Sequence, residues 1–558
     1  MTQRHAWLRA LIFSLSGLVI FSAILGGWLA RSAVPFFDSW DGGVGFLLNL
    51  PDNPGLFLAH HNEHRIVITR LLLWVDFYLF GGRDMFLVLT NYLFAFGTWC
   101  ALWSGLKSIN RNKVAPRDLN LVGAVIAAWL LLWSQDINFT WGFQSQVHAA
   151  QFFPLLSFLL LSHAAQNGPR AHLLFGGALV LGIVSAGTMA NGALTLGFMA
   201  IWALVLRMRV WQIVLLTLLG GLILRLYMMD YSTPSGHTTI LETIQSYPIA
   251  TLVFTFEFLG NPFAHVIGPF GAGRMIVMLL GMILTGSAAY LTYSFIRERP
   301  THPVIPGLVL YIIYVGATAF LTAGGRLFIH EYASLTSRYT TPSVVAWAAL
   351  VCIISPWMFR RFYSSKQIAT GFLVFAALGL MAMFVPIVRK GLPPAGYHDT
   401  QAVAVLALEL GVRDDEQIGS IYPRAPVVLT IADRATAIDL GVFKHRTYRG
   451  LRESIGTFWI ASDAPRCRGQ VLQSNALEMD RNHLRVQGQI EHVLRGRKRA
   501  RVLLINDNGM IIGAGLTEAP RRDANLEDGA KWISPFTGYL RTPRDGPIRF
   551  ASQTCRTK

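Results

Sequence analysis

Long apolar runs recur along the first 387 residues of this chain, and they limit its possible folds more than any other feature. A helix needs ~20 residues, mostly apolar, to cross the ~30 Å hydrocarbon core of a membrane. Of the 558 residues, 53% are hydrophobic and 14% are charged, whereas about 25% are charged in an ordinary soluble domain. These values predict a polytopic α-helical membrane protein. They exclude a disordered chain, a nucleic-acid-binding tail and an ordinary cytosolic enzyme.

The first apolar run, residues 10–30, follows Arg4 and Arg9. It is long for the apolar region of a signal peptide, and more apolar runs follow, so we interpret it as an uncleaved first span. A cleaved signal peptide is the alternative. The other runs are centred near residues 94, 127, 157, 180, 199, 220, 284, 312, 352 and 377.

Two further apolar segments, 64–82 and 246–262, are ambiguous. Because Lys and Arg concentrate in cytoplasmic loops, the basic loops decide how these segments are counted. If both lie on the membrane surface, the basic groups around Lys107 and Arg297 fall in the cytoplasm. This assignment predicts about 11 spans, a cytoplasmic N-terminus and an outside C-terminal domain, as in a protein of the bacterial inner membrane with a periplasmic domain.

The net charge of +17 would suggest nucleic-acid binding in a soluble protein. In this chain, about half of the excess positive charge lies in loops that orient the spans, and the rest lies after Arg389. The long apolar runs also end there. We therefore predict a transmembrane domain over 1–388 and an outside domain over 389–558.

The C-terminal region changes from a helical to a β pattern. Residues 397–420 have helical spacing, and Asp507-Asn508-Gly509 predicts a hairpin turn. Short strand-like runs at regular spacing favour a β-sandwich. Cys467 and Cys555 flank the main strand set, and a disulfide between them suits an oxidising compartment, with two free thiols as the alternative. The runs are 427–431, 458–461, 484–490, 501–505, 510–516 and 548–551.

Aromatic and basic residues of this domain offer a glycan-binding interpretation. Trp532, Phe536 and Tyr539 are expected in the core, and sugar stacking is the alternative. A basic set could meet anionic headgroups or an acidic glycan, or be a solvated surface. It comprises Arg495, Arg497, Lys498, Arg499, Arg501, Arg521 and Arg522.

The strongest candidate for chemistry follows the first span. Asp38 and Asp41 lie in Phe36-Phe37-Asp38-Ser39-Trp40-Asp41, with aromatic neighbours. A carboxylate here could act as a general base toward an acceptor hydroxyl. A helix N-cap is the structural alternative.

The second motif is His60-His61-Asn62-Glu63-His64-Arg65. His60 and His64 would lie one turn apart on a helix and could bind a metal. We favour instead a cluster that binds an anionic or sugar group, in which the guanidinium of Arg65 suits a phosphate.

Further candidates lie in later outside loops. Gln144 belongs to 138–146, where amides and aromatics alternate. Arg326 and Arg338, the latter followed by Tyr339, would lie at the outer membrane interface, where Arg is uncommon, and they fit a lipid phosphate. Snorkelling anchors are the alternative.

Together, these residues resemble the C-type glycosyltransferases (GT-C), integral membrane enzymes that use polyprenyl-phosphate sugars. In that superfamily the first outside loop begins with an acidic catalytic residue, and two juxtamembrane helices follow. Asp38 and Asp41 match the acidic position, and His61 to Arg65 with the apolar 71–81 match the second helix. The chain departs from the adjacent Asp-Glu pair of the protein O-mannosyltransferases, which leaves the identity of the base open. The outside sandwich is similar to that of bacterial arabinofuranosyltransferases.

The resemblance implies an inverting glycosyltransferase with a polyprenyl-phosphate sugar donor. Asp38 or Asp41 would be the base, and the donor phosphate would be bound by Arg65, Arg326 and Arg338. The substrate-binding residues would be His61, Glu63, His64, Gln144 and Tyr339. The acceptor would be a periplasmic glycan, lipid or protein. No cofactor is firmly implied, and a role for a divalent cation stays open. A flippase or transporter of a lipid-linked glycan, and an O-antigen-type glycan polymerase, are the alternatives.

Overall fold

The structure is a computed structural model with side chains. It describes residues 3–231, 239–300, 302–330, 332–391, 397–460, 464–492, 499–518, 521–522, 532–542, 546–553 and 555. Only the backbone is described at 397–399, 492, 521–522 and 532.

Two compact units make up the chain, and each is described by itself. The first unit comprises Met1–Arg31, Gly55–Leu72 and Leu87–Leu392. The second comprises Ser32–Pro54, Leu73–Phe86 and Pro393–Lys558. Parts of the predicted first outside loop therefore group with the C-terminal residues, and the division runs through α3 (Val67–Phe80).

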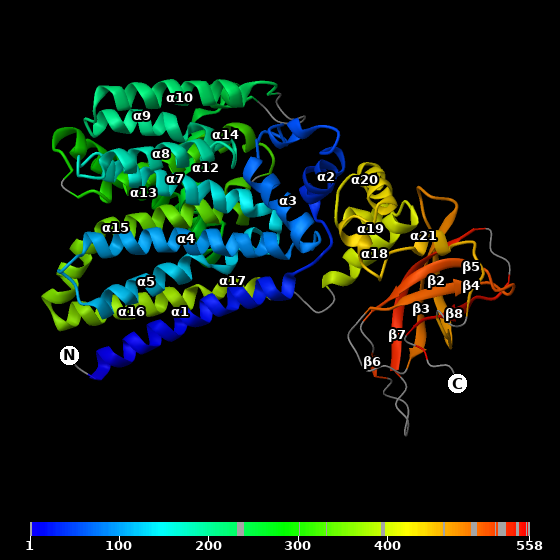
Figure 1. Ribbon diagram of the computed structural model, residues 1–558. Coiled ribbons are helices and arrows are strands. Elements are labelled where there is room, and N and C mark those ends of the chain that lie inside the picture. Colours follow the sequence, from blue (N-terminus) through cyan, green and yellow to red (C-terminus); the bar gives the residue numbers. More distant parts are fainter. Residues whose placement is uncertain are drawn as a thin grey trace. The chain divides into compact units, whose positions relative to one another are not determined.

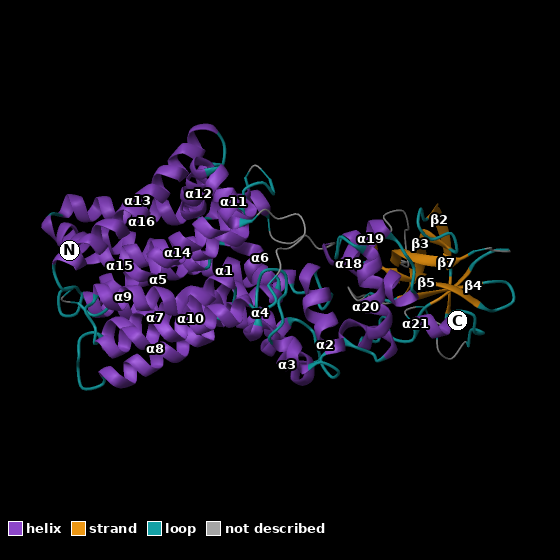
Figure 2. Ribbon diagram, turned by 90° about the horizontal axis from the view of Figure 1, so that it is seen from above, coloured by secondary structure: helices purple, strands orange, loops and turns teal. Residues whose placement is uncertain are grey.

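The first unit is a helical bundle whose long helices lie side by side (Figures 1 and 2). Within the described part of the chain, ten helical stretches are long and apolar enough to cross a membrane. The chain is thus a polytopic helical membrane protein by length and composition. The helices of these stretches are α1 (Gln3–Ala30), α4 (Met85–Ile109), α5 (Pro116–Leu130) with α6 (Asp136–Thr140), α7 (Ser145–Ala164), α10 (Val210–Met228), α12 (Pro248–Ile267), α13 (Gly271–Arg297), α14 (Ile305–Arg326), α15 (Thr340–Ser364), and α16 (Lys366–Ala382) with α17 (Phe384–Lys390).

The spans differ from the prediction at three places. Segment 246–262 was expected on the membrane surface, but it forms most of α12, which is long enough to cross. The runs near 180 and 199 were counted as spans, but α8 (Ala171–Ser185) and α9 (Thr195–Val205) are too short at 1.5 Å per residue to cross ~30 Å alone. The carboxylate of α12, Glu257, forms an ion pair with Arg274, which lowers the cost of a charge inside this apolar helix.

Close helix packing in the bundle depends on small residues. A Cβ added to Gly260 of α12 would lie 2.0 Å from the carbonyl oxygen of Val277, and one added to Gly281 of α13 would lie 2.0 Å from that of Phe256. The two helices therefore contact each other backbone to backbone, as small residues allow in membrane helices. Tyr311 of α14 is fully buried in the bundle, and its hydroxyl donates to the side chain of Gln151 of α7 at 2.7 Å.

The second unit begins with helical segments. Trp40 of η2 (Trp40–Gly45) is fully buried in one core with α18 (Tyr397–Leu410) and α20 (Ala425–Ala437). The strand expected at 427–431 is wrong, because these residues form the middle of α20. Shorter helices complete this part: η1 (Phe37–Ser39), α2 (Phe46–Asn49), α19 (Asp415–Gly419), η9 (Gly441–Lys444) and α21 (Leu451–Ser454).

The rest of the unit is one antiparallel half-barrel sheet, not the expected sandwich of two sheets. Its order is β1-β8-β4-β5-β7-β3-β2, with β6 pairing β7. The hairpin predicted at residues 507–509 is confirmed, because β4 and β5 pair antiparallel and Gly509 has a φ of 82°. The strands are β1 (Arg466–Cys467), β2 (Gly469–Ala476), β3 (His483–His492), β4 (Arg501–Ile505), β5 (Ile511–Thr517), β6 (Arg521–Arg522), β7 (Trp532–Arg541) and β8 (Arg549–Ala551).

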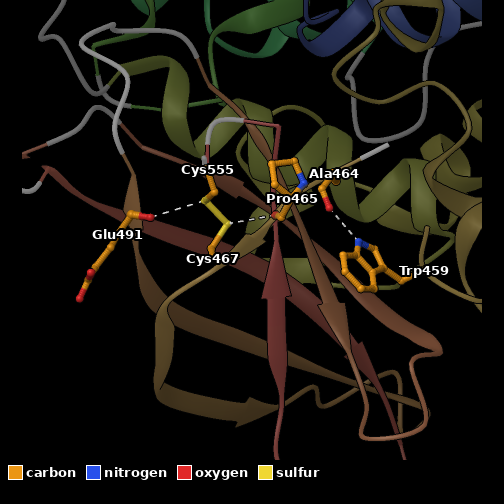
Figure 3. Close-up of a disulfide and its surroundings, with 6 residues drawn as sticks. All are labelled: Trp459, Ala464, Pro465, Cys467, Glu491 and Cys555. Atoms are coloured by element: carbon orange, nitrogen blue, oxygen red, sulfur yellow. Dashed lines mark hydrogen bonds between the residues drawn. A yellow bond between two sulfur atoms is a disulfide. The ribbon is translucent and has the colours of Figure 1, made fainter. Parts of the chain in front are cut away.

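A disulfide closes this sheet. Cys467 on β1 is bonded to Cys555, which follows β8, and their Cα atoms are 5.5 Å apart (Figure 3). Phe536 and Tyr539 are 1% exposed and belong to the core, which removes them as sugar-stacking residues. The side chain of Trp532 lies outside the described residues, as do most side chains of the predicted basic surface.

Candidate functional site

The polar motif at 60–65 forms a tight turn at one end of the first unit. His61 and His64 exchange two backbone hydrogen bonds of 2.7 and 3.0 Å, and Asn62 between them has a φ of 52°. Asn tolerates this left-handed conformation better than most residues. Helix α3 begins only at Val67, so the expected placement of His60 and His64 one turn apart on a helix is wrong.

Glu63 of this turn is bound to Arg326 and lies close to His64. Arg326, at the end of α14, forms an ion pair with its carboxylate, and His64 Nε2 lies 3.6 Å from the same oxygen. Burial alone would raise the pKa of Glu63, but His64 and Arg326 lower it to about 2. Glu63 is therefore ionised at any physiological pH, and it neutralises one of the cations predicted to bind phosphate.

Arg65 binds the end of α10. Its Nε donates to the carbonyl of Tyr227 at 3.0 Å, and its two terminal nitrogens donate to the carbonyls of Leu58 and Met229. The Tyr227 hydroxyl accepts from the Arg65 backbone at 2.9 Å. Carbonyl acceptors satisfy the donors of a guanidinium but do not cancel its charge, and a cation at a helix C-terminus is favoured. Arg65 thus fixes the turn to α10 and remains a source of positive potential.

A second arginine increases this positive charge. Arg70 on α3 is 4% exposed and donates to the carbonyls of Ala59 and Phe57. Burial, with the adjacent charge of Arg65, lowers the pKa of Arg70 to about 10, so it still carries a proton at neutral pH. Burial and Arg65 also lower the pKa of His60. We call Glu63, Arg65, Arg70 and Arg326 the guanidinium cluster.

The turn also contacts the loop that contains Gln144. The His61 ring lies 5.3 Å from that of Phe143, and Thr69 Oγ1 is 2.9 Å from Ser145 Oγ. Gln144 is 6% exposed. The structure therefore brings His61 next to the 142–145 segment.

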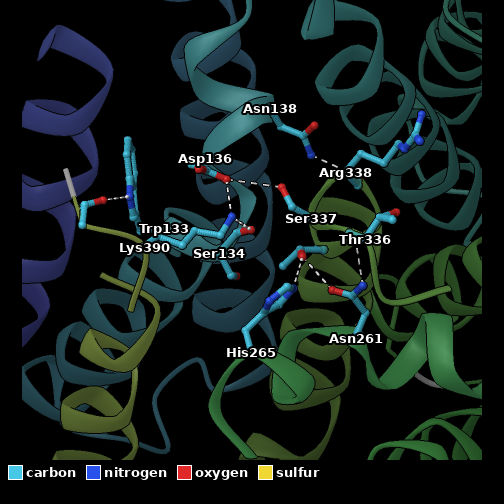
Figure 4. Close-up of polar contacts among 12 residues, drawn as sticks. Trp133, Ser134, Asp136, Asn138, Asn261, His265, Thr336, Ser337, Arg338 and Lys390 are labelled. Atoms are coloured by element: carbon cyan, nitrogen blue, oxygen red, sulfur yellow. Dashed lines mark hydrogen bonds and ion pairs between the residues drawn. The ribbon is translucent and has the colours of Figure 1, made fainter. Parts of the chain in front are cut away.

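Arg338 lies in a polar network between loops (Figure 4), and Tyr339 follows it in the chain. Asn138 is fully buried and donates to the backbone carbonyl of Arg338 at 3.0 Å, so its amide supports the loop and does not face a ligand. The Arg338 guanidinium is exposed and stacks over the Tyr339 ring at 5.6 Å. Among the described residues it has no carboxylate partner, which leaves it available to an anion.

Sequence reasoning missed two carboxylates of this region and their partners: Asp136, which is partly exposed, and Glu257, which is buried. Asp136 accepts from Lys390 at 2.6 Å and from Ser337 at 3.3 Å. Glu257 is bonded to Arg274 and accepts from the Ser334 hydroxyl at 2.7 Å. A carboxylate inside an apolar run is itself a signal for such a partner, and Glu257 was detectable in that way.

The candidate bases Asp38 and Asp41 belong to the second unit. Asp41 Oδ2 accepts from the Tyr422 hydroxyl at 3.1 Å, and that hydroxyl lies 3.3 Å from the Arg424 guanidinium that donates to it. Burial, offset in part by Arg424, raises the pKa of Tyr422, so the phenol keeps its proton and remains a donor to Asp41. Asp38 lies in η1, after Phe37, whose φ is 44°.

No protein-family model matches the chain, and no curated protein matches it significantly.

Proposed function

We propose that this protein is an inverting glycosyltransferase that takes its sugar from a polyprenyl-phosphate donor at the outer membrane face. The guanidinium cluster carries the proposal. Arg326 pairs with Glu63, whereas Arg65, at the end of α10, and the neighbouring Arg70 donate to backbone carbonyls and keep their charge. Such an excess of fixed cations beside apolar helices suits a phosphate on a lipid. The likeness of residues 36–83 to GT-C enzymes supports it independently.

The reaction needs a base and an anion-binding site. Asp38 or Asp41 takes the proton of the acceptor hydroxyl, whose oxygen attacks the anomeric carbon while the bond from that carbon to the phosphate oxygen breaks. The polyprenyl phosphate leaves as an anion, so it needs no proton from a general acid. Arg65, Arg70 and Arg338 stabilise the charge that develops on it.

The remaining predicted residues have supporting roles in this proposal. Arg326, bound to Glu63, orients the turn and does not bind the phosphate alone. His61, His64, Gln144 and Tyr339 position the sugar. The acceptor is a glycan, lipid or protein of the cell envelope.

The test is a transfer assay with purified full-length protein and a defined polyprenyl-phosphate sugar. Arg338→Gln should raise the KM for the donor, because this exposed cation has no carboxylate partner among the described residues and can be changed without leaving a buried charge unpaired. Arg170→Gln, exposed and in a different loop, is the matched control. Asp38→Asn and Asp41→Asn separate the two candidate bases. Near wild-type turnover in both Asp variants would refute the assignment of the base.

A further inference from the structure

A concave site lies at the end of the first unit opposite the polar motif at 60–65. A cavity of about 650 Å³ forms where α4 ends and α5 begins. Helix α5 leads from this cavity toward the loop that contains Asn138, so the whole length of that helix separates the cavity from the polar motifs described above. The proposed function makes no use of the cavity.

The polar lining of the cavity is basic. Lys107, Arg111 and Lys113 line it together with Asn112 and Asn120, and all five are exposed. No carboxylate is among its lining residues in the described part of the chain. The three cations also form no ion pair with any described residue.

The adjacent carboxylate does not offset these charges. Asp118 is 2% exposed, and one of its oxygens accepts from Arg9 of α1 at 2.9 Å. The other accepts from the Tyr363 hydroxyl at 2.8 Å. Asp118 is thus already neutralised by Arg9, and the cavity retains the positive potential of its three basic side chains.

The other wall is apolar and lies where spans end. Trp103, Val114, Pro116 and Leu119 line it, and Lys107 Nζ lies 5.2 Å from the centre of the Trp103 ring. Trp near the end of a membrane helix marks the headgroup depth, and a Lys one turn beyond it extends its charge toward the headgroups. A soluble anion would gain nothing from this wall, whereas a lipid would contact it with its glycerol and first acyl carbons.

We propose that this cavity binds the phosphate headgroup of an anionic phospholipid. The three cations would contact the phosphate, and the wall of Trp103 and Leu119 would contact the lipid body. Basic pockets between membrane helices bind anionic headgroups in this way.

The test counts bound lipid on the full-length protein by native mass spectrometry. The protein in neutral detergent is titrated with phosphatidylglycerol or with phosphatidylcholine of the same acyl chains. The triple variant Lys107→Gln, Arg111→Gln and Lys113→Gln should show a preference for phosphatidylglycerol over phosphatidylcholine that is lower by on the order of tenfold. The charge-conserving variant Lys107→Arg, Arg111→Lys and Lys113→Arg should keep it.

The matched control removes the same charge elsewhere. Arg170, Arg297 and Arg299 are exposed and do not line the cavity, so their triple change to Gln should leave the preference intact. Equal preference in the wild type and both Gln variants would overturn the proposal. So would complete displacement of the lipid by equimolar glycerol phosphate, because a soluble headgroup would then be the ligand.

Discussion

Glu409 provides a measurable link between pH and the stability of the second unit. It lies on α18 with its side chain fully buried, and among the described residues only the backbone near Arg452 and Leu451 offers its carboxyl group hydrogen-bond donors. Burial, reinforced by the nearby charge of Glu453, raises the pKa of Glu409 from 4.5 to about 7. Between pH 4.5 and about 7, Glu409 is therefore protonated in the folded protein and ionised in the unfolded chain.

The sign and size of the effect follow from this difference. For an acid whose pKa rises on folding, the stability is complete below about pH 4.5, falls as the pH rises to about 7, and stays low above that. At about 1.36 kcal/mol per pKa unit, the cost is ~3 kcal/mol at pH 8. Glu409→Gln keeps the shape without the charge, so it should stabilise the second unit at pH 8 and have little effect at pH 4.5.

Hydrogen exchange on the full-length protein measures this directly. Protection of the buried amides of α18, corrected for the intrinsic rates at each pH, should rise roughly a hundredfold in Glu409→Gln at pH 8. Glu478→Gln is the control, because Glu478 is exposed. Equal protection of wild type and Glu409→Gln at pH 8 would refute the reasoning.

Three further changes test other parts of the structure, each by thermal or chemical unfolding of the full-length protein. Gly260→Ala places a Cβ against the backbone of α13 and should lower the free energy of unfolding by at least ~1–3 kcal/mol. A loss below about 0.5 kcal/mol, which is the scatter of surface changes, would show that the helices do not touch there. Glu63→Gln removes the ion pair with Arg326 and should destabilise the protein by ~2–3 kcal/mol at pH 7. Because folding lowers the pKa of Glu63, this penalty should disappear as the pH falls from about 4.5 to 2. A penalty that persisted at pH 2 would contradict the pairing. Cys467→Ala opens the disulfide and should cost ~2–5 kcal/mol in the second unit under oxidising conditions but little under reducing ones.

Local signals in the sequence predicted local structure well. The Asp-Asn-Gly turn forms the expected hairpin because only a few residues can adopt its backbone angles. The apolar runs predicted a helical membrane protein because the ~30 Å thickness of the hydrocarbon leaves few alternatives.

Contacts between residues that are far apart in the chain determine the features that could not be predicted from the sequence. Residues 427–431 have the composition of a strand, but they form part of α20, where Val428 is buried in a helical core. Segment 246–262 was assigned to the membrane surface from the position of the basic loops, but it forms most of α12, which is long enough to cross. The sequence also could not show that the guanidinium of Arg65 donates to the backbone at the end of α10.

The most direct test of the proposed function follows the donor lipid itself. Full-length protein is incubated with an isotopically labelled polyprenyl-phosphate sugar and cell-envelope acceptors, and both lipid products are quantified. Glycosyl transfer predicts one polyprenyl phosphate released for each sugar transferred, with inverted stereochemistry at the anomeric carbon. Recovery of the intact lipid-linked sugar with every acceptor tried, together with its movement across the membrane, would contradict transfer and identify a transporter.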